Sequence, residues 1–207
     1  MKNIVVSLVI PAMNEEESLS QLFEEIQLSC DAHWKEQYEV LVIDDGSRDG
    51  TWAKIEELKK KYDFIRAWRF LHNCGKATAL NLAFGKTQGK YVVTLDADLQ
   101  DDPKEIPEMI ALLDSKKLDL VSGWKQKRHD PWHKTMPSKV FNGVVSLVAG
   151  QKLHDFNCGL KAYRGEVVKS LDLYGDYHRF IPLMASWMGF KIGEKVVQHR
   201  ARIYGVS

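Results

Sequence analysis

The chain has 207 residues, a length that suits one domain with a sizeable core better than two. Its composition, 44% hydrophobic and 28% charged, excludes a disordered or fibrous protein. The formal net charge of +1 gives the whole chain no electrostatic attraction to nucleic acid or membrane, so we predict no nucleic-acid partner.

The cysteines and the apolar runs indicate the kind of cellular compartment in which the chain works. Cys30, Cys74 and Cys158 are widely spaced and match neither a disulfide framework nor a zinc site, which favours a reducing compartment. The first apolar run stops at Pro11 and acidic residues follow at once, so we predict no signal peptide. No stretch approaches the ~20 apolar residues that a spanning helix needs. Any membrane contact is therefore predicted to be peripheral.

Strand and helix patterns alternate in the first part of the chain. Continuous apolar runs predict buried strands, and apolar residues at helical spacing predict helices. The predicted strands are 4–10 (ended by Pro11), 39–43, 65–70, 91–95 and 118–122, and the predicted helices are 16–29, 51–61, 78–84 and 103–113. Short connections between strands buried on both faces predict an α/β fold, a mostly parallel central sheet with helices on both faces.

The alternation stops after residue 123. Residues 124–139 are basic and aromatic, with Asp130 as the single acid, and are predicted to form a loop. Residues 140–148 place apolar side chains on one helical face. A basic loop that carries Trp132, followed by an apolar helix face, favours a surface that rests on an anionic membrane. Packing of that helix face on the core is the alternative.

Polar clusters follow three predicted strands, at Asn14-Glu15, Asp44-Asp45 and Asp96-Ala97-Asp98. In parallel α/β sheets, ligands bind beyond the carboxyl ends of the strands. Asp96 and Asp98 can present oxygens to one hard cation, Mg²⁺ or Mn²⁺, and Gln100 adds a neutral oxygen. Such a cation bridges diphosphate oxygens and neutralises the leaving nucleotide. A solvated turn is the alternative for this short sequence taken alone.

The other candidates also have structural alternatives. Asp44-Asp45-Gly46-Ser47 has turn chemistry, although a carboxylate there can accept hydrogen bonds from a base or ribose. Asn14-Glu15 also suits a helix start. Lys76 is either a phosphate ligand or a surface lysine, and Phe70 stands where a nucleotide hydrolase phosphate loop requires glycine. The arginines near 178–182 and 199–202 suit phosphate binding or a solvated basic face.

Seven segments, in order, resemble the family 2 glycosyltransferases, which have the GT-A (Rossmann-like) fold. They are VIPAMNEEESL (9–19), VIDDGSRDGT (42–51), HNCGKATALNLAF (72–84), TLDADLQDDP (94–103), DFNCGLKAYR (155–164), HRFIP (178–182) and HRARIYGVS (199–207). The resemblance is to the branch that glycosylates polyprenyl or dolichyl phosphate, such as dolichol-phosphate mannosyltransferases and bactoprenol glucosyltransferases. It implies one GT-A domain, 1–207, with a nucleotide-binding half (1–123) and an acceptor-side half (124–207). Because relatives usually continue into membrane-associated helices, we expect a chain truncated before that region.

The resemblance also implies roles for single residues. Asp96, Asp98 and Gln100 would hold the metal, Asp44 would read the base, and Lys76 would lie near the phosphates. The residues expected to bind the nucleotide sugar are Pro11, Met13, Glu15, Asp44, Asp45, Lys76, Ala97, Asp98, Lys125, Arg128, Arg200 and Arg202. Family members often carry arginine where Lys125 stands, and lysine lacks the bidentate fork. Arg200 and Arg202 flank the position of a phosphate-binding arginine, and the choice between them stays open.

The implied reaction is inverting transfer of a hexose from a UDP- or GDP-sugar to a membrane polyprenyl phosphate at the cytoplasmic face. A phosphate monoester has a second pKa of about 6 and has little need of a general base. Catalysis would then rest on Asp98, the metal and the cations that stabilise the leaving group. Asp155 is the candidate base or substrate-orienting carboxylate, or else an acid that fixes its turn.

Two other functions stay open. Transfer to a saccharide hydroxyl in cell-surface polysaccharide synthesis needs an efficient base, and the Gln-x-x-Arg-Trp signature of processive polymerases is absent from the sequence. A non-catalytic nucleotide-sugar-binding module is the other, and the intact Asp45, Asp96 and Asp98 argue against it. The sequence does not choose between UDP and GDP, the sugar, or the oligomeric state.

Overall fold

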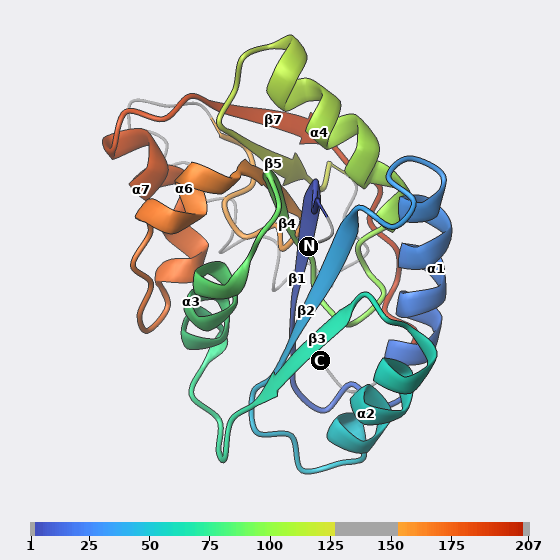
Figure 1. Cartoon of the computed structure of the whole chain (residues 1–207). Coiled ribbons are helices and arrows are strands. Elements are labelled where there is room, and N and C mark those ends of the chain that lie inside the picture. Colours follow the sequence, from blue (N-terminus) through green and yellow to red (C-terminus); the bar gives the residue numbers. More distant parts are fainter. Residues whose placement is uncertain (1–2, 127–152, 205–207) are drawn as a thin grey trace.

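A seven-stranded sheet forms the middle of three layers in the computed structural model, which describes residues 3–126 and 153–204 (Figure 1). The strands are β1 Val6–Ala12, β2 Tyr38–Asp44, β3 Ile65–Arg69, β4 Tyr91–Thr94, β5 Leu120–Trp124, β6 Lys161–Arg164 and β7 Ile192–Val196. The helices are α1 Leu19–Asp31, α2 Thr51–Lys61, α3 Lys76–Lys86, α4 Ile106–Ser115, α6 Gly165–Ser170 and α7 Ile181–Trp187, with short 3-10 helices η1 Pro103–Glu105 and η2 Tyr177–Phe180.

The sheet is parallel except at one strand. Its order is β3-β2-β1-β4-β6-β5-β7, and β6 runs antiparallel to both β4 and β5. The carboxyl ends of β1, β2 and β4 therefore meet at one edge, and β6 begins at that same edge, where Lys161 pairs with Thr94. The expectation of a mostly parallel sheet is confirmed.

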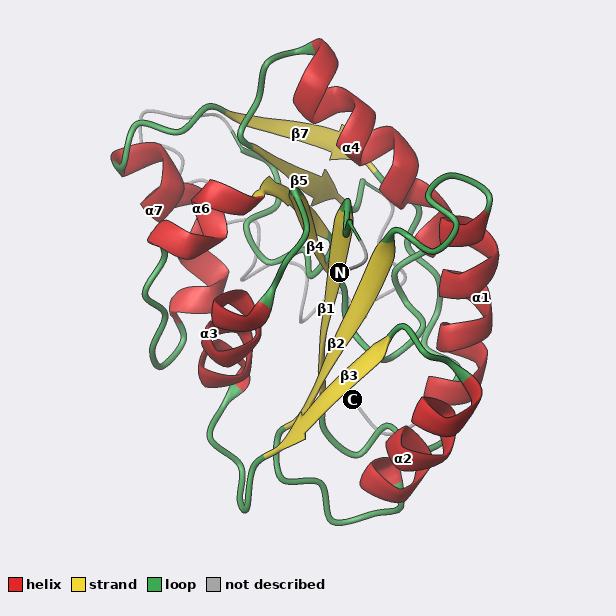
Figure 2. Ribbon diagram, in the orientation of Figure 1, coloured by secondary structure: helices red, strands yellow, loops and turns green. Residues whose placement is uncertain are grey.

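Helices cover both faces of the sheet because strand side chains alternate between two apolar cores. Leu8 and Val42 face the core shared with α1, α2 and α4. Val9 and Leu41, their neighbours along the strands, face the core shared with α3, α6 and α7. The two sets of helices lie on opposite sides of the sheet (Figure 2). Strands that are apolar on both faces are thus fully buried, as their sequence predicts.

Two strands, β1 and β5, continue two residues beyond their predicted ends. β1 does not end at Pro11, which pairs with Ile43 before the strand finishes at Ala12. The ladder between β1 and β4 stops at Val9, so β1 has one neighbouring strand at Pro11 and tolerates the missing N–H as an edge strand does. Trp124, predicted in a loop, is the last residue of β5 and pairs with Val196 of β7.

The acceptor-side half contains elements that sequence analysis does not predict, namely β6, α6, α7 and β7. The predicted basic loop (124–139), beyond residue 126, and the apolar helix face (140–148) lie outside the described residues, and so does Arg128. Within residues 3–126 and 153–204, none of the helices combines the length and the hydropathy required to cross a membrane.

Helix α1 offers a matched test of the core. Phe23 is completely buried and stacks on Tyr62, whereas Leu28 on the same helix is 75% exposed. We expect Phe23→Ala to lower the free energy of unfolding by about 3–5 kcal/mol, because it removes a buried ring and leaves a cavity. Leu28→Ala should change it by less than about 0.5 kcal/mol. Urea titration of both variants checks this, and equal losses would contradict the packing of α1.

Candidate active site

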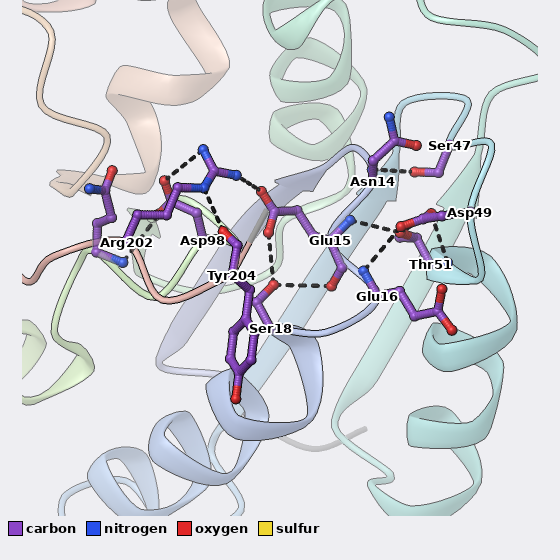
Figure 3. Close-up of polar contacts among 11 residues, drawn as sticks. Asn14, Glu15, Glu16, Ser18, Ser47, Asp49, Thr51, Asp98, Arg202 and Tyr204 are labelled. Carbon is purple, nitrogen blue, oxygen red and sulfur yellow. Dashed lines mark hydrogen bonds and ion pairs between the residues drawn. The ribbon is translucent and has the colours of Figure 1, made fainter. Parts of the chain in front are cut away.

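Two loops at the carboxyl edge of the sheet are tied together by backbone-to-side-chain hydrogen bonds (Figure 3). The Asn14 N–H donates to Ser47 Oγ at 2.9 Å, and the Glu15 N–H donates to Thr51 Oγ1 at 2.8 Å. Asn14 has a φ of 56°, a left-handed conformation that asparagine tolerates better than most residues. The loop after β1 is therefore fixed against the loop after β2, which sets the direction of the Glu15 side chain.

The Glu15 carboxylate forms one end of a short polar chain. It accepts hydrogen bonds from Ser18 Oγ at 2.9 Å and from Arg202 Nη2 at 2.7 Å (Figure 3). The other terminal nitrogen of Arg202 lies 3.8 Å from Asp98 Oδ2. Burial raises the pKa of Glu15, while Ser18 and Arg202 act against that shift. Arg202 thus joins the loop after β1 to the Asp-Ala-Asp segment after β4.

Asp96 and Asp98 follow β4 and differ in their electrostatic surroundings. Lys76 Nζ, at the start of α3, lies 2.5 Å from Asp96 Oδ1. Burial acts to raise the pKa of Asp96, but Lys76 and Lys125 outweigh it and hold that pKa at about 2. The pKa of Asp98 is raised, first by burial and then by the charge of Asp96. Asp98 therefore carries a negative charge that nearby cations only partly compensate.

The turn after Asp98 is held by buried contacts. Leu99 has a φ of 63° and is fully buried, a strained backbone for a bulky residue that costs about 1–3 kcal/mol. The Gln100 N–H donates to Asp98 Oδ1 at 3.2 Å, and its carbonyl accepts from the Arg200 N–H. Lys125 Nζ lies 2.8 Å from the buried Asp101 carboxylate. The surrounding fold thus fixes the backbone that carries the two aspartates.

A first pocket, of about 290 Å³, lies beyond the carboxyl ends of β1, β2 and β4. Its walls are Pro11, Ala12, Met13, Glu15, Asp45, Asn73, Gly75, Lys76, Asp96, Ala97 and Asp98. Only Ala12, Asn73 and Gly75 of this set are absent from the sequence prediction. The structure therefore brings most of the predicted nucleotide-binding and metal-binding residues to one pocket.

Asp44 and Asp45 lie differently although they are adjacent. Asp44 is fully buried, accepts a hydrogen bond from the Ser47 N–H and lies 3.2 Å from Arg69 Nε. Asp45 lines the first pocket and accepts hydrogen bonds from the N–H groups of Cys74 and Gly75. Asp45 thereby positions the residues that precede Lys76, and the reading of a base by Asp44 stays a prediction.

The two C-terminal arginines also differ. Arg200 forms ion pairs with Glu25 of α1, at 2.6 Å, and with Asp102, at 2.7 Å. Asp102 in turn caps η1 by accepting a hydrogen bond from the Lys104 N–H. Arg200 therefore links α1 to η1, whereas Arg202 reaches the edge of the first pocket through Glu15 and Asp98.

A second pocket, of about 230 Å³, adjoins the first. Pro11, Lys76 and Asp96 line both pockets, so the Lys76–Asp96 pair stands at their boundary. The second pocket is completed by residues of α3, β4, β6, the loop before β6, η2 and α7. Lys161 and Arg179 are among them. Sequence analysis considers Arg179 for phosphate binding but does not select Lys161.

Asp155, the candidate base, is buried beside the second pocket. It is 1% exposed, and its Oδ1 accepts a hydrogen bond from the Asn157 N–H at 3.1 Å. Its own N–H donates to Glu194 Oε1. These contacts fix the turn before Asn157, which lines the second pocket. A catalytic part for Asp155 stays a prediction.

Gly159 is a site residue that sequence analysis does not select. A Cβ placed on it would lie 2.4 Å from Asp96 Oδ2, closer than any real contact permits. Any larger residue at 159 would therefore have to displace the Asp96 side chain, which Lys76 holds in place. The signal in the sequence is the Cys-Gly pair at 158–159, but its reason appears only once β6 lies beside β4.

The two aspartates suit a divalent cation that binds together with a ligand. The described residues contain no group of three or more His, Cys, Asp or Glu side chains that could hold a metal alone. Mg²⁺ is usually held by one or two carboxylates together with substrate phosphates and water. Asp96 and Asp98, both on the wall of the first pocket, fit that donor set.

Comparison with known proteins identifies the family to which the chain belongs. A family model described as glycosyl transferase family 2 matches residues 7–172. The chain is 34% identical, over 100% of its own length, to a dodecaprenyl-phosphate galacturonate synthase of Rhizobium johnstonii. It is 35% identical, over 98%, to an undecaprenyl-phosphate 4-deoxy-4-formamido-L-arabinose transferase of Edwardsiella ictaluri. The chain spans 62% of the length of each of these relatives.

Solved structures share the fold at lower identity. The mannosyltransferase PcManGT of Pyrobaculum calidifontis, in complex with GDP-Man and Mn²⁺, matches with a TM-score of 0.70 and 20% identity, over 92% of this chain and 54% of that one. A glucosyl-3-phosphoglycerate synthase of Mycobacterium tuberculosis, in complex with Mn²⁺ and UDP-glucose, matches with a TM-score of 0.73 and 21% identity, over 97% and 72%. With the family model covering most of its length, the chain belongs to glycosyl transferase family 2.

Proposed function

We propose that this chain is the catalytic part of an inverting glycosyltransferase that moves a sugar from a UDP- or GDP-sugar to a polyprenyl phosphate. The observation that carries the proposal is the first pocket, where Asp96 and Asp98 lie between Lys76 on one side and Arg202 on the other. Paired carboxylates next to fixed cations suit a diphosphate bound with a divalent metal.

The proposed site for the nucleotide-sugar donor is supported by the charged residues around it. Asp96 and Asp98 would hold Mg²⁺ or Mn²⁺, with Gln100 as a further ligand, and the metal when bound neutralises charge on the diphosphate. Lys76 lies on the pocket wall, and Arg202 pairs with the wall residues Glu15 and Asp98. Both are positive groups already fixed by ion pairs, so little reorganisation is needed as charge develops on the leaving nucleotide. Solved relatives with Mn²⁺ and UDP-glucose or GDP-Man support this class of donor.

The loops after β1 and β2 complete the nucleotide side. Met13, Glu15 and Asp45 line the first pocket but not the second, and a base and ribose would lie beside them, whereas Pro11 lines both pockets. Of the two C-terminal arginines we assign the diphosphate contact to Arg202, because Arg200 is engaged with α1 and η1.

The acceptor end of the proposal is supported by the curated relatives, both named for transfer to a polyprenyl phosphate. Because a phosphate monoester is largely dianionic at neutral pH, it can attack the sugar C1 without losing a proton to the enzyme. The burial of Asp155 and its hydrogen bond to Asn157 agree with a part in orienting the loop. We further propose that the chain acts peripherally at the cytoplasmic face of the membrane.

A transfer assay tests this function. Undecaprenyl phosphate in detergent is incubated with a panel of UDP- and GDP-sugars and Mn²⁺, and glycolipid is detected by mass spectrometry. We expect product from at least one donor, its loss with EDTA, and none from undecaprenol, which lacks the phosphate. Product that forms equally well in excess EDTA would refute metal-dependent transfer.

Asp98→Asn tests the metal-diphosphate site. The change keeps the side-chain shape but removes a carboxylate that Asp96 already repels, so the melting temperature should not fall. Mn²⁺-dependent UDP binding, measured by calorimetry, should fall below detection. Asp63 is an exposed acid near the amino ends of β2 and β3, at the opposite edge of the sheet, so Asp63→Ala serves as control and should bind UDP as the unaltered chain does. Undiminished UDP binding by Asp98→Asn would contradict the assignment of Asp98 to the metal-diphosphate site.

The two arginines separate binding from stability. We expect Arg202→Gln to weaken UDP binding at least about tenfold, since a hydrogen bond to a charged group contributes about 1.5–3 kcal/mol. Arg200→Gln should instead lower the melting temperature, because it leaves Glu25 and Asp102 without their shared partner, while UDP affinity stays within about twofold. Calorimetry and thermal unfolding of both variants decide, and the reverse pattern would assign the phosphate contact to Arg200.

A further inference from the structure

The second pocket is lined by more positive than negative side chains. Lys76, Lys161 and Arg179 face Asp96 as the single carboxylate on its wall. Thr94, Asn157 and Tyr163 add neutral polar groups, and Leu80, Phe156 and Ile181 add an apolar side. Three cations against one carboxylate leave an excess of positive charge in a small, partly enclosed space.

Lys161 is the most unusual of these cations. Its side chain is 97% buried, since its exposed fraction is 3%, and burial lowers its pKa. Its ammonium donates to the Cys158 carbonyl but forms no ion pair with a carboxylate of residues 3–126 or 153–204. Buried lysines are normally paired, because an isolated ammonium in a protein interior is strongly disfavoured. An anion in the adjoining pocket would supply the missing partner.

Two residues of η2 share this environment. Arg179 is exposed and makes no ion pair within the described part of the chain. His178 has a buried Nδ1 without a hydrogen-bond partner among the described residues. Burial and then the charges of Lys76 and Arg179 lower the pKa of His178 to about 4, so the ring is neutral at physiological pH. The positive charges around the pocket thus add to the effect of burial in keeping the imidazole neutral, and a neutral ring has one nitrogen that can accept a hydrogen bond.

We propose that the second pocket is an oxyanion subsite in which Lys161 and Arg179 bind a phosphate monoester or a carboxylate. The inference rests on the proposed function for its place in the reaction: the Lys76–Asp96 pair separates this pocket from the diphosphate, so its occupant lies next to the transferred sugar. Two sources carry the required chemistry. One is the phosphate of the lipid acceptor, and the other is the carboxylate of an acidic sugar on the donor.

Three variants isolate the subsite. Lys161→Met removes the buried ammonium, and Arg179→Gln removes an exposed charge whose loss does not threaten folding. Lys169→Met is the matched control, because Lys169 also donates to carbonyl oxygens, those of Phe84 and Thr87, and lines neither pocket. Thermal unfolding establishes whether each variant is folded. If Lys161→Met does not fold, Arg179→Gln still tests the subsite.

Two calorimetric arms distinguish the sources of the anion. The first compares geranyl phosphate with geraniol in the absence of nucleotide. The second compares UDP-glucuronate with UDP-glucose in the presence of Mn²⁺. We expect a preference for the anionic probe in at least one arm, weakened about tenfold or more by Lys161→Met and by Arg179→Gln and unchanged by Lys169→Met. A response in the geranyl phosphate arm identifies the acceptor phosphate as the bound anion, and a response in the UDP-glucuronate arm identifies the sugar carboxylate.

The outcomes separate the two proposals. Absence of any anion preference in the unaltered chain, or a preference that both variants retain, overturns the oxyanion subsite even when UDP binds normally. Failure of both UDP and GDP to bind with Mn²⁺ overturns the proposed function, while the geranyl phosphate arm, which needs no nucleotide, still decides whether Lys161 and Arg179 bind an anion.

Discussion

Carboxylates crowd the edge of the sheet where β1 and β4 end, and their mutual repulsion is the constraint on which this part of the structure depends. Lys76 neutralises Asp96, Lys125 neutralises Asp101, and Arg202 lies between Glu15 and Asp98. The cations come from distant parts of the chain, so this compensation of charge exists only in the folded protein. Of this set, Asp98 is the least compensated, which makes it the natural place for a further positive charge.

The reversed strand determines what lies beside these acids. Were β6 parallel to β4, its beginning would lie at the far edge of the sheet. Because it is antiparallel, the loop before it arrives at the edge where β4 ends, and Gly159 permits that loop to pass against Asp96. The first pocket is thus built by loops after parallel strands, and the second by a loop that precedes an antiparallel one.

Sequence reasoning succeeds where the apolar signal is strong and continuous. β1, β2 and β4 are such runs, and the acids that follow them are therefore placed correctly at one edge. β6 has four residues with a charge at each end, and β7 is half-exposed, so neither carries a pattern that predicts a strand. The same limit hides Lys161, whose surroundings depend entirely on strand order.

Neighbouring residues of one type are a second limit. Asp44 ends β2 and turns inward, whereas Asp45 begins the loop and faces the first pocket, a difference that depends on one residue of register. Arg200 and Arg202 differ in the same way, within a segment that has no regular secondary structure.

The wall shared by the two pockets has one more consequence, which is thermodynamic. Since Lys76 and Asp96 line both, any occupant of one that moves this pair changes affinity at the other, and linkage makes that influence equal in both directions.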